Sequence, residues 1–383
     1  MASKELIGGV RQGTAKPVNR RRISVWAQPN DVMPRGASTV NSAYTKLGGV
    51  LDDVSLQMTF CNSAKLDAVV WDFDFLPGGK DTEKDKWLAD VKSARADQVR
   101  FDAKSGAFNG FNDWLNASIA GSESPKLDVF IKTLQTFFDT HCKGYDGISF
   151  DIEGLGPTGS NTVAQMAKAV STFYGKVADS IWPKAVGIAA GALVSATDAF
   201  NDYANGGPPT APSRSQRAIP GALVQPYEMA VNHPNLIVRP MMYDGQPAFS
   251  KTKGAPRDNA EGMLQWQRDM CVYALVTCNG GKGIANGSFQ VGIKTNSQGG
   301  TGLGGVTTET NLLRHATECR THKSRKTATL PAGQDPDIPD DVGIIFFPSL
   351  SGVTTYAKID GALNPTGPAA GIVGTPIQVP RIV

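Results

Sequence analysis

The sequence predicts an α/β fold, namely a (β/α)8 TIM barrel with long loop insertions. Short apolar, β-rich runs alternate with longer helical patterns, and this alternation is typical of parallel strand pairing. The runs are continuously apolar, as in VGIIFF at 342–347, which indicates strands buried on both faces. About eight such units fit a barrel better than two domains, because a barrel of this kind takes roughly 250 residues or more. An open doubly wound sheet is the main alternative.

The predicted domain order is a basic arm at 1–21, the barrel at 22–350 and a Pro/Gly-rich C-terminal extension at 351–383. Eight runs are predicted as strands: 22–28, 68–75, 114–119, 147–153, 186–190, 236–244, 289–295 and 342–348. A further run at 55–62 leaves the count uncertain by one. Apolar residues at helical spacing predict helices at 126–143, 161–181 and 259–276. Long loops are expected at 206–215, 279–305 and 364–380.

Composition excludes several classes of protein. Lys and Arg number 38 against 35 Asp and Glu, a net charge of +3, so a nucleic-acid partner is not expected. The five cysteines form no CxxC pair and the four histidines show no ligand spacing, so we expect free thiols and no metal site. No apolar run is long enough for a membrane span or a Sec signal peptide. We expect a cytoplasmic protein, or one secreted by a non-Sec route or within a secreted complex.

The segment GYDGISFDIEG at 144–154 carries the main chemical signal. Alternate side chains of a strand share a face, so Ser149, Asp151 and Glu153 are predicted to project together while Ile148 and Phe150 pack the other way. Two neighbouring carboxylates repel, and one of them can hold a proton and act as a general acid. Glu153, nearest the strand end, is the predicted acid. The alternative is an ordinary strand end with solvated carboxylates.

This segment resembles the DGxDxDxE signature of the family 18 glycoside hydrolases, the chitinases and endo-β-N-acetylglucosaminidases. Asp146, Gly147, Asp151 and Glu153 match it, and Ser149 stands where the first of the paired aspartates is usual. Residues 241–244 (MMYD) resemble the MxYD strand of the family, and 118–121 (SIAG) its SxGG strand end. GIIFFP resembles the last strand, with Phe346 or Phe347 in place of the usual tryptophan. The likeness spans roughly 114–348.

The resemblance implies a glycosidase that cleaves β-1,4-linked N-acetylglucosamine polymers by substrate-assisted, retaining hydrolysis, with no metal and no cofactor. Glu153 would protonate the glycosidic oxygen, Asp151 would orient the 2-acetamido group, Tyr243 would hydrogen-bond its carbonyl and Asp244 would support the same sugar. A serine cannot repel Asp151 as an aspartate would. We therefore expect Asp151 to titrate lower than in the family and the activity to be retuned.

A sugar site also needs flat apolar faces for the pyranose rings. Five residues are the candidates for binding an oligo- or polysaccharide that contains N-acetylglucosamine: Asp146, Ser149, Trp26, Trp71 and Phe347. For the two tryptophans, barrel packing is the alternative.

The main functional alternative is a non-catalytic glycan-binding barrel, or a structural barrel within a larger assembly. GTGLGG at 300–305 satisfies a dinucleotide-binding pattern but lacks the acidic residue that should follow. A protein partner would dock on the N-terminal arm or the C-terminal tail. The sequence leaves open chitin, an N-glycan or peptidoglycan as the polymer, and endo or exo action.

Overall fold

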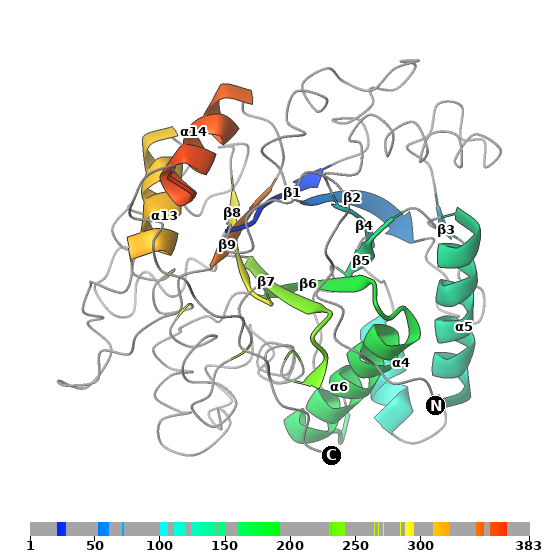
Figure 1. The fold of residues 1–383 in the computed structure, drawn as a ribbon. Helices are drawn as coiled ribbons and strands as arrows, with labels where there is room; N and C mark the ends of the chain where they lie inside the picture. The colour runs from blue at the N-terminus through cyan, green and yellow to red at the C-terminus, as the bar shows by residue number, and fades with distance from the viewer. Residues whose placement is uncertain are drawn as a thin grey trace.

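Nine strands and five helices are defined in the computed structural model of the chain (Figure 1). The structure describes residues 21–27, 53–60, 71–72, 100–105, 111–119, 124–141, 145–150, 159–191, 230, 232–241, 264, 267, 271, 284, 288–294, 309–321, 342–347 and 353–365. The strands are β1 (Ile23–Ala27), β2 (Asp53–Phe60), β3 (Trp71–Asp72), β4 (Arg100–Ser105), β5 (Gly147–Phe150), β6 (Ala185–Gly191), β7 (Leu236–Met241), β8 (Gln290–Lys294) and β9 (Gly343–Phe347). The helices are α4 (Phe111–Ile119), α5 (Ser124–His141), α6 (Val163–Ser180), α13 (Glu309–Thr321) and α14 (Val353–Leu363).

Eight of these strands pair in parallel to form a closed ring, which we call the strand ring. Its order is β1, β9, β8, β7, β6, β5, β4, β2, and β2 pairs with β1 to close it. β3 pairs antiparallel with the end of β2 and lies outside the ring. Figure 1 shows the ring at the centre, with α4, α5 and α6 on one side and α13 and α14 on the other. The protein is therefore an α/β protein with parallel strands.

Two predicted strands were wrong. Residues 114–119 are helical and belong to α4, where the Ser118 hydroxyl donates to the Leu115 carbonyl one turn earlier. A short apolar run has no periodicity that separates strand from helix, and here contacts with α6 decide: Asn161 Nδ2 donates to both oxygens of Asn116. The SxGG assignment fails with it, since Ser118 and Ile119 lie in the helix.

The run at 68–75 is the second correction. Its described part, Trp71–Asp72, is the antiparallel strand β3. The ring takes instead β2, which covers the uncertain ninth run, and β4, which the sequence analysis missed. β4 reads RFDAKS, and its charged alternate residues concealed a buried strand.

The remaining elements agree with the prediction within the described residues. Strands were predicted at 22–28, 147–153, 186–190, 236–244, 289–295 and 342–348, and they correspond to β1, β5, β6, β7, β8 and β9. Helices predicted at 126–143 and 161–181 are α5 and α6. From the third predicted helix, Leu264, Gln267 and Cys271 are helical and buried. Within the segment predicted as the C-terminal extension, α14 is an ordered helix.

Helix α6 covers the outer side of β5. It begins at a capping box, in which Thr162 Oγ1 accepts from the Gln165 backbone and Gln165 Oε1 accepts from Thr162 N at 2.8 Å. Its Phe173 ring lies 5.7 Å from Phe150 of β5 and 5.7 Å from Phe130 of α5, and all three are fully buried. This aromatic layer fixes β5 against its two helices.

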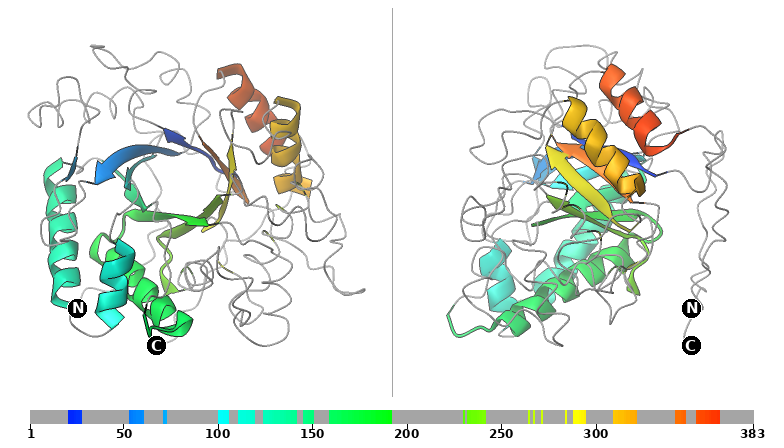
Figure 2. Two further views of the ribbon diagram at one scale, coloured as in Figure 1. Left: turned by 180° about the vertical axis from the view of Figure 1, so that it is seen from behind. Right: turned by 90° about the vertical axis from the view of Figure 1, so that its left-hand side faces the viewer.

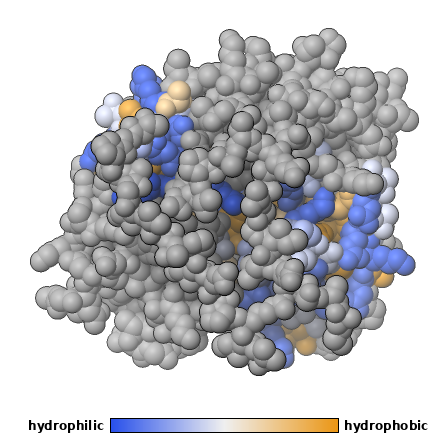
Figure 3. All heavy atoms as spheres, in the orientation of Figure 1, coloured by the Kyte–Doolittle hydropathy of each residue, from blue (hydrophilic) through white to orange (hydrophobic). Residues whose placement is uncertain are grey.

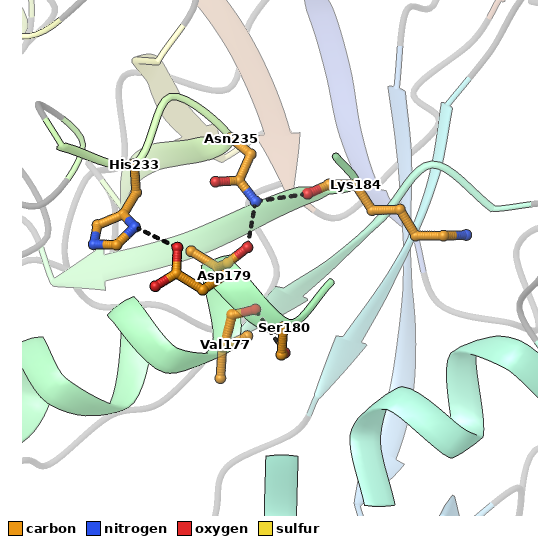
Figure 4. Close-up of polar contacts among 7 residues, drawn as sticks. Val177, Asp179, Ser180, Lys184, His233 and Asn235 are labelled. Carbon is orange, nitrogen blue, oxygen red and sulfur yellow. Dashed lines mark hydrogen bonds and ion pairs between the residues drawn. The ribbon is translucent and has the colours of Figure 1, made fainter. Parts of the chain in front are cut away.

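The amino ends of β6 and β7 are held by a second polar contact group (Figure 4). Asn235, just before β7, donates from Nδ2 to the carbonyls of Ala178 in α6 and Lys184 before β6, both at 2.9 Å. Its own carbonyl accepts from Val186 N at 2.8 Å. His233 Nδ1 lies 3.5 Å from Asp179 Oδ1 nearby. These contacts stabilise the end of the ring away from the carboxyl ends of the strands.

Helices α13 and α14 lie side by side on the far side of the ring (Figure 2). Phe346 of β9 packs on Tyr356 of α14, with ring centroids 5.7 Å apart. Residues before β1 and after α14 meet: Arg21 N donates to Asn364 Oδ1 at 2.8 Å, Arg21 Nη1 to the Leu363 carbonyl at 3.1 Å, and Asn364 Nδ2 to the Arg21 carbonyl at 3.0 Å. We call these three bonds the Arg21–Asn364 tie.

A buried polar contact links α13 to the helical residues at 264–271. His315 Nδ1 donates to Gln267 Oε1 at 2.5 Å, and Gln267 Nε2 donates to Cys319 Sγ at 2.9 Å. Burial lowers the pKa of His315 to about 4, and the charge of Arg314 adds to this. Burial likewise raises the pKa of the Cys319 thiol. Cys271 and Cys319 are both free.

Hydrophilic side chains of the described elements gather on the outside. In Figure 3 they lie at the upper left and at the right, over the regions where Figure 1 places α13–α14 and α5. None of the described helices is long and apolar enough to cross a membrane.

Candidate active site

Strand β5 orients the predicted catalytic segment. Ile148 and Phe150 face the helix layer, where Phe150 packs edge-on against Phe173 and Tyr174 of α6. Ser149 faces the other way, into the strand ring, and is fully buried. The alternation predicted for the motif is therefore confirmed for its described part.

Ser149 belongs to a continuous set of hydrogen bonds across the ring, which we call the interior network. Ser55 Oγ and Arg239 Nη1 both donate to Ser149 Oγ, each at 2.7 Å. Arg239 Nε donates to Gln290 Oε1 at 2.7 Å, and Gln290 Nε2 donates to Ser24 Oγ at 2.8 Å. The five residues come from β1, β2, β5, β7 and β8, and each is at most 1% exposed.

A glycine on the intervening strand makes the contact between β5 and β7 feasible. Gly187 of β6 pairs in register with Ser149. A Cβ at Gly187 would lie 2.5 Å from Arg239 Nη1 and 2.6 Å from Ser149 Oγ, well inside van der Waals distance. Arg239 therefore reaches Ser149 only because this position carries no side chain.

The interior network places a permanent positive charge inside the ring. A guanidinium stays protonated in proteins and can only donate hydrogen bonds. A buried cation favours the ionised form of a nearby carboxylate. Its position, two residues before the carboxyl end of β7, puts this charge beneath the end of the ring where barrel enzymes hold their substrates.

The sequence analysis missed both Arg239 and Gly187. Arg239 interrupts the apolar run LIVRPM, and a single charge inside a buried strand was the available signal. Gly187 gave no signal of its own, because its requirement arises from residues 38 and 52 positions away in the chain.

The four predicted catalytic residues lie outside the described part of the chain. Asp151 and Glu153 come one and three residues after β5 ends, and Tyr243 and Asp244 come two and three residues after β7 ends. Because β5 and β7 are parallel members of one ring, their carboxyl ends lie at the same rim. The roles of these four residues stay predictions.

Asp146 lies at the opposite end of β5. It precedes the strand, is half-buried, and its carbonyl accepts from Ala185 N at 2.8 Å at the start of β6. It is thus separated from the interior network by the length of β5, and a sugar-binding role for it stays a prediction.

The aromatic candidates occupy three different places. Trp26 of β1 is 1% exposed, and a Cβ at Gly292 of β8 would meet its ring at 3.2 Å, so the ring lies inside the barrel-like ring of strands against Gly292. This contact lies one layer nearer the carboxyl ends than the Ser24–Gln290 bond. Trp71 pairs through its backbone with Phe60, beyond the part of β2 that pairs with β1 and β4.

For the replacement of the missing tryptophan on the last strand, the structure distinguishes the two phenylalanines. Phe346 packs outward on Tyr356 of α14. Phe347, the last residue of β9, therefore stays the candidate. Among the described residues no group of three or more His, Cys, Asp or Glu side chains is arranged to hold a metal ion.

Comparison with known proteins indicates a fold and no more. No family model matches the sequence, and no curated protein matches it. Among solved structures, the C-terminal domain of ChiA from Legionella pneumophila is similar over 89% of this chain and 96% of its own, with a TM-score of 0.51 and 15% identity. A GH18 chitinase from Pseudoalteromonas aurantia is similar over 89% of this chain and 100% of its own, with a TM-score of 0.53 and 10% identity. The chain therefore has a fold like that of GH18 chitinases.

Proposed function

We propose that the protein is a glycosidase of the family 18 type, which cleaves β-1,4-linked N-acetylglucosamine polymers by substrate-assisted, retaining hydrolysis. The observation that carries the proposal is the 2.7 Å contact between Ser149 and Arg239. It brings the interior sides of β5 and β7 together directly below the points where Asp151 and Tyr243 follow. The fold shared with GH18 chitinases and the sequence motif support the same reading.

We further propose that the strand ring belongs to a complete (β/α)8 barrel, and the register of the ring supports this. Going round from β1 to β9, paired residues lie 29, 47, 45, 38, 50, 51 and 53 positions further along the chain, and the return from β9 to β1 is 321 positions. One circuit thus ends eight residues from its start, which is the shear of such barrels.

In the proposed reaction, Glu153 protonates the glycosidic oxygen as the bond to the anomeric carbon breaks. The 2-acetamido oxygen of the substrate attacks that carbon and forms an oxazolinium ion, whose positive charge the Asp151 carboxylate stabilises. Tyr243 hydrogen-bonds the acetamido group and Asp244 supports the same sugar. Water then opens the ring with Glu153 as the base, so the anomeric configuration is retained.

The pyranose rings need apolar faces near these groups. Trp26, whose ring lies against Gly292 in the layer nearest the carboxyl ends, is the described aromatic residue closest to this rim. Trp71 at the end of β2 and Phe347 at the end of β9 are the other two candidates.

Hydrolysis of a chromogenic chitobioside tests the proposal, with Glu153→Gln as the decisive variant. Removing a general acid is expected to lower kcat by about 100-fold or more. Glu309→Gln is the matched control, since Glu309 lies on α13, where its carboxylate pairs with Lys358. Equal hydrolysis by wild type, Glu153→Gln and Glu309→Gln would exclude the enzyme.

A non-catalytic glycan-binding barrel is the second candidate, and Ser149 is the observation that favours it. Its hydroxyl replaces a carboxylate of the family motif and is fully committed to a buried network. Calorimetric titration with chitooligosaccharides separates the two candidates: a binder without activity would give heat of binding and no release of product over hours.

A further inference from the structure

Arg239 is held rigidly in the interior network. Its Nε binds Gln290 and its Nη1 binds Ser149, each at 2.7 Å, and Gln290 is fixed in turn by Ser24 at 2.8 Å. The missing side chain at Gly187 leaves only enough room for this one arrangement. A guanidinium held on two sides by different strands cannot turn away when substrate binds.

Hydrogen-bond accounting gives Ser149 a direction. Its Oγ accepts from Arg239 Nη1 and from Ser55 Oγ, which uses both lone pairs of a hydroxyl. The remaining capacity of Ser149 is to donate its own proton. Donation to a carboxylate is the strongest use of that proton, because charge-assisted bonds are about twice as strong as neutral ones.

The next residue predicted on the same side of β5 is Asp151. We infer that Arg239 is a positioning residue, which acts through the Ser149 hydroxyl to hold the Asp151 carboxylate ionised and oriented toward the substrate. This inference rests on the proposed function. A fixed positive charge thus takes the place in the ring where the family motif has a second carboxylate.

Other charged residues of the ring strands also face consideration for this role. They are Asp53 on β2, Arg100, Asp102 and Lys104 on β4 and Lys294 on β8; β1, β5, β6 and β9 carry none. Glu153 and Asp244 follow β5 and β7. Arg239 is singled out because its guanidinium contacts Ser149 directly.

The test compares two Ser→Ala variants in the same network. Ser149→Ala removes the link between Arg239 and Asp151, whereas Ser24→Ala removes a buried hydrogen bond to Gln290 at the far end. For Ser149→Ala we expect kcat to fall about tenfold and the acidic limb of kcat/KM to move to higher pH by about one unit. Ser24→Ala is expected to leave this limb in place. A limb that moves equally in both variants, or in neither, overturns the inference.

The charge itself is tested by Arg239→Lys and Arg239→Met. Lysine retains the charge and is expected to keep the acidic limb near its wild-type position, while methionine is expected to shift it upward by about one unit or more. If Arg239→Met does not fold, Ser149→Ala against Ser24→Ala and Arg239→Lys still decide. A large shift with lysine contradicts the role of the charge.

Direct titration separates this inference from the proposed function. The side-chain carboxyl of Asp151 is followed by carbon NMR in wild type and Ser149→Ala, with Asp151→Asn for assignment. A pKa that rises in Ser149→Ala supports the inference even if the wild type hydrolyses nothing, in which case the proposed function alone fails. An unchanged Asp151 pKa, with hydrolysis intact, refutes the inference alone.

Discussion

The two sides of β5 are built from different materials. The outer side presents Ile148 and Phe150 to the rings of Phe173 and Tyr174, and its contacts are apolar and edge-on. The inner side presents Ser149 to Ser55 and Arg239, and its contacts are directional hydrogen bonds between buried groups. One strand thus separates an apolar layer from a polar one.

The difference separates stability from the site. Apolar burial is non-directional and contributes roughly in proportion to area. A buried polar network contributes little net stability but is costly to leave half-made, so it fixes positions. Changes in the helix layer should therefore lower stability and spare the chemistry, whereas changes in the interior network should disturb the site.

The largest expected effect belongs to the outer layer. Phe173→Ala removes the ring that contacts both Phe130 and Phe150 and leaves a cavity, so the free energy of unfolding should fall by about 3–5 kcal/mol. Urea unfolding measures the loss, and kcat per folded molecule should match the wild type. Phe173→Leu, which retains most of the volume, should lose less. A large drop in kcat at low urea would break the separation.

His315 tests a polar group within the helix layer. Its pKa is about 4 in the folded protein, below its ordinary value of 6.5, so the unfolded chain binds a proton first as the pH falls. Stability should be retained above pH 6.5 and fall by up to about 3 kcal/mol as pH drops toward 4. Urea unfolding at a series of pH values measures this. His315→Gln should flatten the decline between these values, and an identical decline would assign it to other groups.

Gly187→Ala attacks the inner side. The added Cβ would lie 2.5 Å from Arg239 Nη1, so the arginine must shift, at a cost of about 1–3 kcal/mol of overpacking. Unfolding and chitobioside hydrolysis should both be affected. Gly361→Ala in α14 is the matched control, because nothing lies within 4 Å of its Cβ. The control should gain about 0.5–1 kcal/mol from helix propensity; a loss there as large as at Gly187 would contradict the steric argument.

The smallest effect is expected on the surface. Lys176 and Asp128 join α6 to α5 by an exposed ion pair at 2.6 Å, with side chains 41% and 66% exposed. Lys176→Met should change the free energy of unfolding by less than about 1 kcal/mol, because exposed pairs are screened by solvent. Thermal unfolding at low and high salt measures it, and a clear loss that disappears in salt would raise the importance of the pair.

Local patterns in the sequence predicted one side of β5 well and the other only in part. The alternation of Ser149 with Ile148 and Phe150 follows from the period of a strand, and so did six of the eight ring strands. The helix at 111–119 and the strand β4 escaped prediction because tertiary contacts, such as Asn161 with Asn116, outweigh short-range pattern.

The interior network escaped for a different reason. Ser149 lies 94 residues from Ser55 and 90 from Arg239, and neither pairing has a local signature. A motif can name the strand that carries the carboxylates. It does not reveal which distant side chains replace a missing member of the motif.

The Arg21–Asn364 tie has a mechanical consequence. It joins residues 343 positions apart, outside the first strand of the ring and beyond the last helix. Tension applied at these two positions would meet three hydrogen bonds side by side before it reached β1, so they would share the load instead of breaking one after another. Whatever is attached at either end of this region would pull from the same spot, and the ring of strands would be shielded until that grip gave way.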